Sequence, residues 1–94
     1  MADLPPLELL EATHEFPGPF VFKAIGLNRD GFVELIVAGI RDVLAMETDP
    51  PYELKQTSGG RHVSVTITPT VESAIQVLAI YERIRAVDGL VMMF

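Results

Sequence analysis

Two segments with helical spacing of apolar residues, each between segments with the period of a β-strand, constrain the fold of this chain most strongly. In residues 30–46 the apolar residues recur at intervals of three and four, which places them on one stripe of a helix: Phe32, Leu35, Ile36, Gly39, Ile40, Val43 and Leu44. Residues 71–87 show the same spacing in Val71, Ala74, Val77, Leu78, Tyr81 and Ile84. We therefore predict two amphipathic helices, each with one face for the core.

Four further segments have the alternation or the composition of strands, namely residues 20–26, 52–57, 63–68 and 90–94. Ser58-Gly59-Gly60-Arg61 is typical of a hairpin connection, because glycine adopts the positive φ angles of tight turns. The order of elements predicts an α+β, ferredoxin-like βαββαβ sandwich. Because crossovers are right-handed, both helices should cover one face of a four-stranded antiparallel sheet, with the first and third strands central.

The ends of the predicted helices carry cap and stop signals. Asp30 is the predicted N-cap of the first helix, since its carboxylate can accept hydrogen bonds from the free amides of the first turn. Asp49-Pro50-Pro51 is predicted to stop that helix. Thr70 is the predicted cap of the second helix.

The first 17 residues differ in pattern from the rest of the chain. Pro6 can open a short helix that carries several leucines, and Phe16-Pro17-Gly18-Pro19 then forbids its continuation. We expect residues 1–17 to form an N-terminal arm and residues 18–94 to form the ferredoxin-like domain.

Charge and cysteine content exclude several classes of protein. The 94 residues include no cysteine, which excludes disulfide scaffolds, zinc ribbons and thiol catalysis. The formal net charge of −6 is opposite to that of nucleic-acid-binding proteins. The apolar stretches are too short to span a bilayer, and the start of the chain does not resemble a secretory signal. We therefore expect a cytoplasmic protein with no nucleic-acid or membrane partner.

The sheet face opposite the helices is the predicted interaction surface. By alternation it carries Val21, Lys23 and Ile25 from the first strand and Ser64 and Thr66 from the third. The last strand adds either Val91 and Met93 or Leu90, Met92 and Phe94. A half-apolar surface of this kind is rarely left uncovered. It could hold a second copy of the chain, the leucines of the N-terminal arm or a ligand, and we rank the second copy first.

No constellation of residues indicates catalysis, a metal site or a cofactor. His14 and His62 are the only histidines and fall on different elements, and Ser64 has no histidine and aspartate arranged near it in sequence. RNA-recognition domains share this order of elements, but His62, Ser64 and Thr66 put no stacking aromatic on the third strand. We expect a protein that is not an enzyme and has no metal or cofactor.

Several motifs resemble those of the YbeD-like family of small bacterial proteins. The stretch from Glu15 to Lys23, EFPGPFVFK, is similar to the opening motif of that family, and Ser58-Gly59-Gly60 with Ser64-Val65-Thr66-Ile67-Thr68 is similar to its central hairpin. Tyr81 and the terminal Val91-Met92-Met93-Phe94 resemble its ending. The chain departs from the family at Arg61-His62-Val63, where the family shows an aromatic before a His-Ser pair, and at the first strand-to-helix loop.

The resemblance implies an ACT-like ferredoxin fold in a family of unknown function. ACT domains are regulatory modules that commonly bind amino acids between paired subunits, near the loop from the first strand to the first helix. The corresponding loop here holds Asn28, Arg29, Asp30 and Gly31, which become the candidate ligand-binding residues. Gly31 would let a ligand approach the backbone, and free amides could hold a carboxylate. The alternative is that these residues form only a capped turn.

Two functional hypotheses follow. The first is a small regulatory or protein-interaction domain, a homodimer or the partner of another protein, that binds through the open sheet face. The alternative is an ACT-like sensor of a small carboxylate or amino acid that uses residues 28–31.

Overall fold

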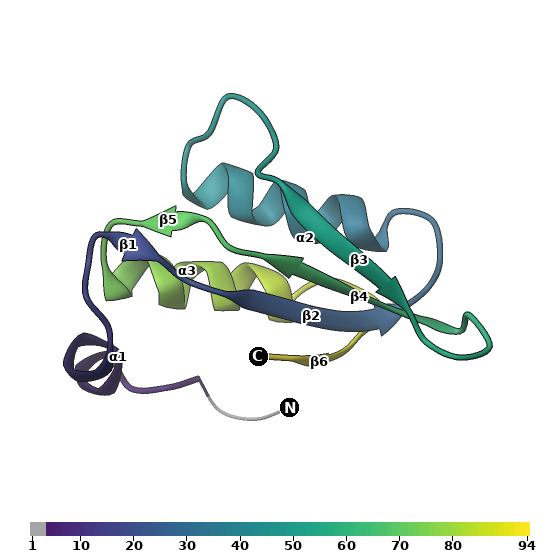
Figure 1. Ribbon diagram of the computed structural model, residues 1–94, viewed down its shortest axis with the longest axis horizontal. Coiled ribbons are helices and arrows are strands. Elements are labelled where there is room, and N and C mark those ends of the chain that lie inside the picture. Colours follow the sequence, from purple (N-terminus) through teal and green to yellow (C-terminus); the bar gives the residue numbers. More distant parts are fainter. Residues whose placement is uncertain (1–3) are drawn as a thin grey trace.

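Residues 4–94 are described by a computed structural model, shown in Figure 1. Along the chain its elements are α1 (Leu7–Thr13), β1 (Gly18–Pro19), β2 (Phe22–Leu27), α2 (Phe32–Val43), β3 (Tyr52–Gln56), β4 (His62–Ile67), β5 (Thr70–Val71), α3 (Ala74–Arg85) and β6 (Leu90–Met93). The main sheet has four antiparallel strands in the order β3-β4-β2-β6, and β1 pairs with β5 in a small second sheet. The α+β class and the central position of the first and third predicted strands, β2 and β4, are confirmed.

The two long helices lie together behind the main sheet in the view of Figure 1. Both central strands turn one side chain in two toward these helices, because successive side chains of a strand point to opposite faces. Phe22 and Ala24 of β2 and Val65 and Ile67 of β4 are each 1% exposed. The predicted inward faces of these two strands are therefore confirmed, and no helix of residues 4–94 lies on the other face of the sheet.

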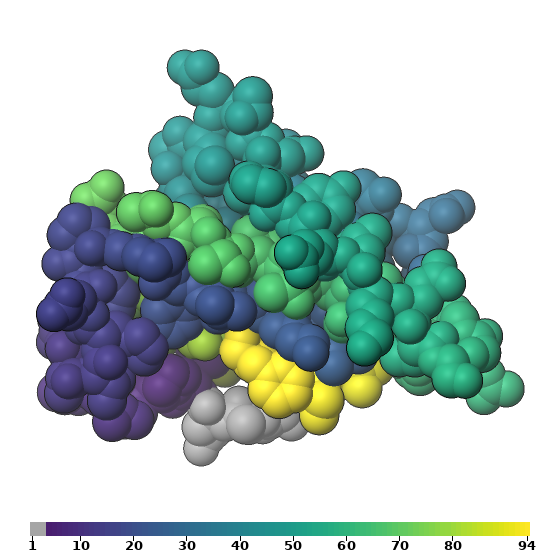
Figure 2. Space-filling model, in the orientation of Figure 1, coloured from purple at the N-terminus to yellow at the C-terminus, as the bar shows by residue number. Residues whose placement is uncertain are grey.

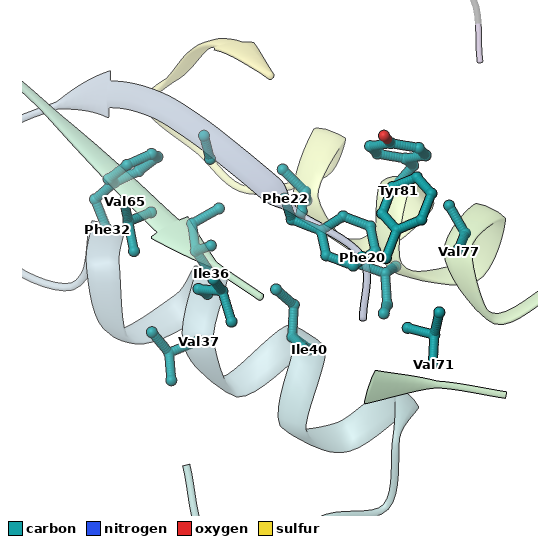
Figure 3. Packing of buried hydrophobic residues seen from close by; sticks show 14 of the residues in the cluster. Phe20, Phe22, Phe32, Ile36, Val37, Ile40, Val65, Val71, Val77 and Tyr81 are labelled. Atoms are coloured by element: carbon teal, nitrogen blue, oxygen red, sulfur yellow. The ribbon is translucent and has the colours of Figure 1, made fainter. Parts of the chain in front are cut away.

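Three aromatic rings of the core gather at its α3 end, while Phe32 lies at the other end beside Val65 (Figure 3). The ring of Phe22 packs edge-on against Tyr81 of α3, with centroids 5.4 Å apart and planes at 72°. The ring centroid of Phe20 lies 5.0 Å from that of Phe22 and 6.4 Å from that of Tyr81. Three aromatic rings therefore pack the sheet against α3. Ile36 and Ile40 of α2 point toward the sheet and complete the core between helix and strands.

The N-terminal helix α1 packs against α3. Leu10 is 4% exposed and belongs to the core, and Leu4 and Leu7 are partly buried against it. Leu4, Leu7 and Leu10 of the predicted arm therefore lie against the core rather than on the open sheet face.

The predicted ends of α2 are wrong at both termini. The helix begins at Phe32, its N-cap is Gly31 with φ of 90°, and no side chain caps it, so the assignment of Asp30 as N-cap is corrected. At the other end Ala45 takes a left-handed φ of 53°, and the amide of Met46 donates to the carbonyl of Arg41 at 3.0 Å. This left-handed termination closes the helix at Val43, well before the two prolines.

The predicted cap of the second helix is also wrong. Thr70 and Val71 form β5, where Val71 pairs with Gly18 and is fully buried. The helix begins later, at Ala74, and its N-cap is Ser73, whose hydroxyl accepts a hydrogen bond from the amide of Gln76 at 3.3 Å. Val71 fits the helical spacing of the apolar residues by coincidence. A buried valine in a strand cannot be told from a buried valine in a helix by its position in the sequence.

The last strand follows neither of the two predicted alternations. A shift of register puts Leu90 opposite Gly26 but Met92 opposite Ile25, so that Val91 is an extra residue in the strand. As a result Leu90 and Met93 both pack against the core, while Met92 lies on the open face.

Candidate functional site

The loop from β2 to α2 contains the four predicted ligand-binding residues, and the first of them is engaged within the chain. The backbone amide of Asn28 donates to the carbonyl of Arg61 at 2.9 Å and continues the β2–β4 ladder by one step. Its side-chain amide Nδ2 donates to the carbonyl of Gly60 at 2.9 Å. Asn28 therefore ties the loop to the β3–β4 hairpin.

Arg29 ties the same loop to the turn before β6. Its Nη2 atom lies 2.7 Å from Oδ2 of Asp88, in an ion pair whose side chains are 47% and 94% exposed. A Cβ added at Gly89 would lie 3.2 Å from the same Nη2, so the guanidinium lies close against the glycine backbone. An ion pair this exposed contributes about 0–1 kcal/mol, so it orients the loop more than it stabilises the fold.

The other two predicted residues complete the turn. Asp30 is exposed, and Gly31 sits at the helix N-terminus with a positive φ and nothing within 4 Å of the place a Cβ would take. The amide of Phe32 donates to the carbonyl of Arg29 at 3.3 Å, which closes the turn. The structure thus brings residues 28–31 together at the meeting point of three loops, with Asn28 and Arg29 already bonded inside the chain.

The open sheet face brings the predicted interface residues together. Lys23 lies opposite Thr66, and Ile25 lies opposite Ser64. Val21, between the buried Phe20 and Phe22, is 56% exposed. Four of the five residues predicted for this face therefore lie on the neighbouring strands β2 and β4, and Val21 directly precedes β2.

The face extends beyond those five residues. β2 runs one residue further than predicted, which adds Leu27 at 39% exposed. Met92 is 47% exposed opposite Ile25, and Phe94 is 57% exposed and exchanges two backbone hydrogen bonds with Lys23, at 3.1 and 2.7 Å. In Figure 2 the C-terminal segment lies beside β2 on the visible face. The alternation of side chains along this strand continues past Gly26 in the sequence, and this pattern could have indicated that Leu27 lies on the open face.

The strands β2 and β3 place three charged side chains on this face, namely Lys23, Lys55 and Glu53. Glu53 of β3 lies opposite Thr66, and Lys55 lies opposite Ser64, so both side chains share the face with Lys23. Two ammonium groups and one carboxylate stand here on a chain with a net charge of −6. The open face is therefore locally basic, with Lys23 bordered by the exposed Phe94.

A separate groove of about 350 Å³ lies outside both candidate sites. It runs between the segment after α2, the connection from β4 to β5 and the start of α3, and it is lined by Leu44, Met46, Pro50, Pro51, Thr68, Pro69, Thr70, Glu72 and Gln76. The amide oxygen of Gln76 is already used by the backbone amide of Glu72 at 2.7 Å.

Within residues 4–94, no three or more histidine, aspartate or glutamate side chains gather in a way that could hold a metal ion. Over the same residues, none of the helices has both the length and the apolar character needed to cross a membrane.

Comparison with known proteins identifies the family of this chain and several bacterial relatives. Residues 11–94 match the model of a family described as protein of unknown function (DUF493). The chain is 32% identical to a UPF0250 protein of Cronobacter sakazakii, over 79% of this chain and 83% of the relative. It is 36% identical to a UPF0250 protein of Shewanella halifaxensis, over 80% of this chain and 83% of the relative. These matches confirm the resemblance that the sequence motifs indicated.

Among solved structures, the chain is similar to the ACT domain from the GTP pyrophosphokinase of Chlorobium tepidum. The TM-score is 0.55 at 12% sequence identity, and the match covers 81% of this chain and 94% of the ACT domain. At this identity the likeness concerns the fold alone.

Proposed function

Since this chain belongs to the DUF493 family of proteins of unknown function, we propose that it is a small bacterial regulatory or protein-interaction domain that acts by binding. We place it in the cytoplasm and assign it the ferredoxin-like, ACT-like layout of two helices over one face of a four-stranded sheet. Its binding surface is the open sheet face, and its occupant is another protein.

The observation that supports this proposal is the concentration of exposed apolar side chains on the sheet face opposite α2 and α3. Ile25 is half-buried there, and around it lie Val21, Leu27, Met92 and Phe94, which are 39–57% exposed. A contiguous apolar surface with a polar rim is typical of a protein-binding site. A rigid sheet behind it also means that little ordering of the backbone opposes binding.

The charges of the face indicate the chemistry of the partner. Lys23 lies between Thr66 of β4 and the exposed Phe94. Covering the face would bury its ammonium group, which is unfavourable unless the partner supplies a carboxylate to pair with it. A two-fold stack of the face on itself would bring two lysines and one glutamate from each copy into one interface. A second copy, which ranks first from the sequence, is therefore a poorer occupant than a different protein whose apolar surface carries an acidic residue.

Site-specific photo-cross-linking in a bacterium tests the proposal. A benzoyl-phenylalanine in place of Phe94 reports on the open face, and the same residue in place of Ile75, which is 67% exposed on α3, reports on the helix layer. We expect a covalent adduct with one other protein from Phe94 and none from Ile75. Purified, that protein should bind the wild-type chain and lose about ten-fold or more in affinity with Lys23→Glu.

The matched control is Arg85→Glu, which makes the same charge change on α3 and should leave the affinity unchanged. Adducts of equal yield from both positions would contradict the proposal. An adduct formed only with a second copy would assign the face to self-association and would also contradict it.

The second candidate function is an ACT-like sensor of a small carboxylate or amino acid at Asn28, Arg29, Asp30 and Gly31. The open space in front of Gly31 favours it, because a ligand could approach the backbone there. A thermal-shift screen of amino acids and small carboxylates tests this function. A ligand of the loop should raise the melting temperature of the wild type but not that of Gly31→Val, and a screen in which no compound does so rejects the sensor.

A further inference from the structure

The strand β3 forms an edge of the main sheet, and all five of its residues are exposed. Within residues 4–94 its single neighbouring strand is β4, with Glu53 opposite Thr66, Leu54 opposite Val65 and Lys55 opposite Ser64. Natural proteins protect free edges with proline, bulges, short strands or charged side chains, and on β3 the charged side chains are Glu53 and Lys55, which are opposite in sign. Tyr52 to Gln56 contain no proline, and the pairing of β3 with β4 runs without a shift of register.

The hydrogen-bond pattern fixes which backbone groups of β3 point away from the sheet. The amide of Thr57 donates to the carbonyl of His62 at 3.0 Å, and the amide of His62 donates to the hydroxyl of Thr57 at 3.2 Å, which marks this pair as a hydrogen-bonding position of the ladder. In an antiparallel ladder such pairs alternate with non-bonded pairs. Lys55 and Glu53 therefore bond to β4, whereas Tyr52, Leu54 and Gln56 direct their amides and carbonyls to the free edge.

The same strand is complementary in charge to an antiparallel copy of itself. When two β3 strands are aligned with Leu54 opposite Leu54, Glu53 of each copy faces Lys55 of the other, on the open side of the sheet. Tyr52 then faces Gln56, and all three outward-directed residues fall at positions that form hydrogen bonds. The register that pairs opposite charges is thus also the one that pairs the free backbone groups.

We propose that two copies of this chain associate by antiparallel pairing of their β3 edges about a two-fold axis at Leu54. Leu54 and Tyr52, which are 53% and 45% exposed on the helix side of the strand, add an apolar contact between the copies. The axis is perpendicular to the sheet, so the two sheets join into one and both open faces point the same way. This interface uses the backbone edge of β3 and, at the border of the open face, the side chains of Glu53 and Lys55. It leaves Lys23 and the exposed apolar side chains of that face uncovered.

Charge exchange tests the register. In Glu53→Lys both cross-strand pairs become lysine against lysine, and in Lys55→Glu both become glutamate against glutamate. By sedimentation between about 10 µM and about 1 mM, a range suited to weak association, we expect each variant to self-associate about ten-fold more weakly than the wild type. Mixing the two variants should restore a dimer, because every facing pair is then opposite in charge, and this dimer shows that both variants are folded.

A cysteine cross-link tests the position of the axis, since the chain has no cysteine of its own. Under mild oxidation Leu54→Cys should form a disulfide-linked dimer about ten-fold faster than Tyr52→Cys, whose copies stand four residues apart in this register. A wild type that stays monomeric up to about 1 mM would overturn the proposal. So would mixed charge variants that do not associate, or a Tyr52→Cys dimer that forms as fast as the Leu54→Cys dimer.

Discussion

Two glycines in the core occupy opposite steric environments. A Cβ at Gly26 would overlap the ring of Phe32 and lie 2.8 Å from the carbonyl oxygen of Gly89, whereas a Cβ at Gly39 of α2 would lie 3.5 Å from Cβ of Arg83, an ordinary contact. We expect Gly26→Ala to lower the free energy of unfolding by about 1–3 kcal/mol through overpacking. Gly39→Ala should raise it by about 0.5–1 kcal/mol, because alanine favours the helix interior. Urea denaturation measures both changes, and equal signs would contradict this description of the core.

Tyr81 gives the fold a dependence on alkaline pH. Burial raises the pKa of its phenol above the ordinary 10.0. Because the folded pKa exceeds the unfolded pKa, the neutral phenol contributes stability that is complete below about pH 10 and is lost as the pH rises through the folded pKa. The stability difference between wild type and Tyr81→Phe should therefore shift in favour of the variant above about pH 10.

Urea denaturation at a series of pH values measures this shift. Tyr52→Phe makes the same change at a residue that is 45% exposed and serves as the control. A Tyr81→Phe difference that stays constant across the alkaline range would contradict the assignment.

At the scale of elements, α1 is part of the folded core. Leu10 is 4% exposed against α3, while its neighbour Leu9 is 51% exposed. Leu10→Ala should lower the free energy of unfolding by about 2–3 kcal/mol through the lost burial and the cavity, and Leu9→Ala by less than about 0.5 kcal/mol. Chemical denaturation of the two variants checks this, and a Leu10→Ala variant as stable as wild type would show that α1 does not contribute to the core in solution.

The elements themselves were predictable because their periodicities are strong. Residues such as Phe22, Val65, Ile36 and Ile40 alternate or recur as the sheet and the helix require, and each is buried. The ends were not predictable, because competing contacts decide them. Asp30 has the chemistry of a cap, but the turn places Gly31 at the cap position.

At the candidate sites, contacts between distant parts of the chain determine the side-chain directions and the hydrogen-bond partners that the sequence did not indicate. The bulge at Val91, which decides that Met92 and Leu90 point to opposite faces, arises from pairing with a strand more than 60 residues earlier. In the loop of residues 28–31, Arg29 meets Asp88 and Asn28 meets Gly60. The sequence shows the polar residues of this loop, but it does not show that Asn28 and Arg29 already bond to Gly60 and Asp88.

At the scale of the whole molecule, the two layers are chemically different. The helix layer covers one side of the sheet, while the other side presents an apolar surface with Lys23 within it. Two methionines report on this difference. Met92 lies on the open face, and Met46 lies in the segment after α2.

Carbon-13 methyl NMR of methionine-labelled protein, in an extract of a bacterium that encodes a member of this family, tests the role of the open face most directly. The Met92 methyl signal should shift and broaden as extract is added while the Met46 signal stays unchanged, and Lys23→Glu should suppress the effect. A response of Met46 without Met92, or a Met92 signal that no amount of extract alters, would contradict the claim that this protein acts through its open sheet face.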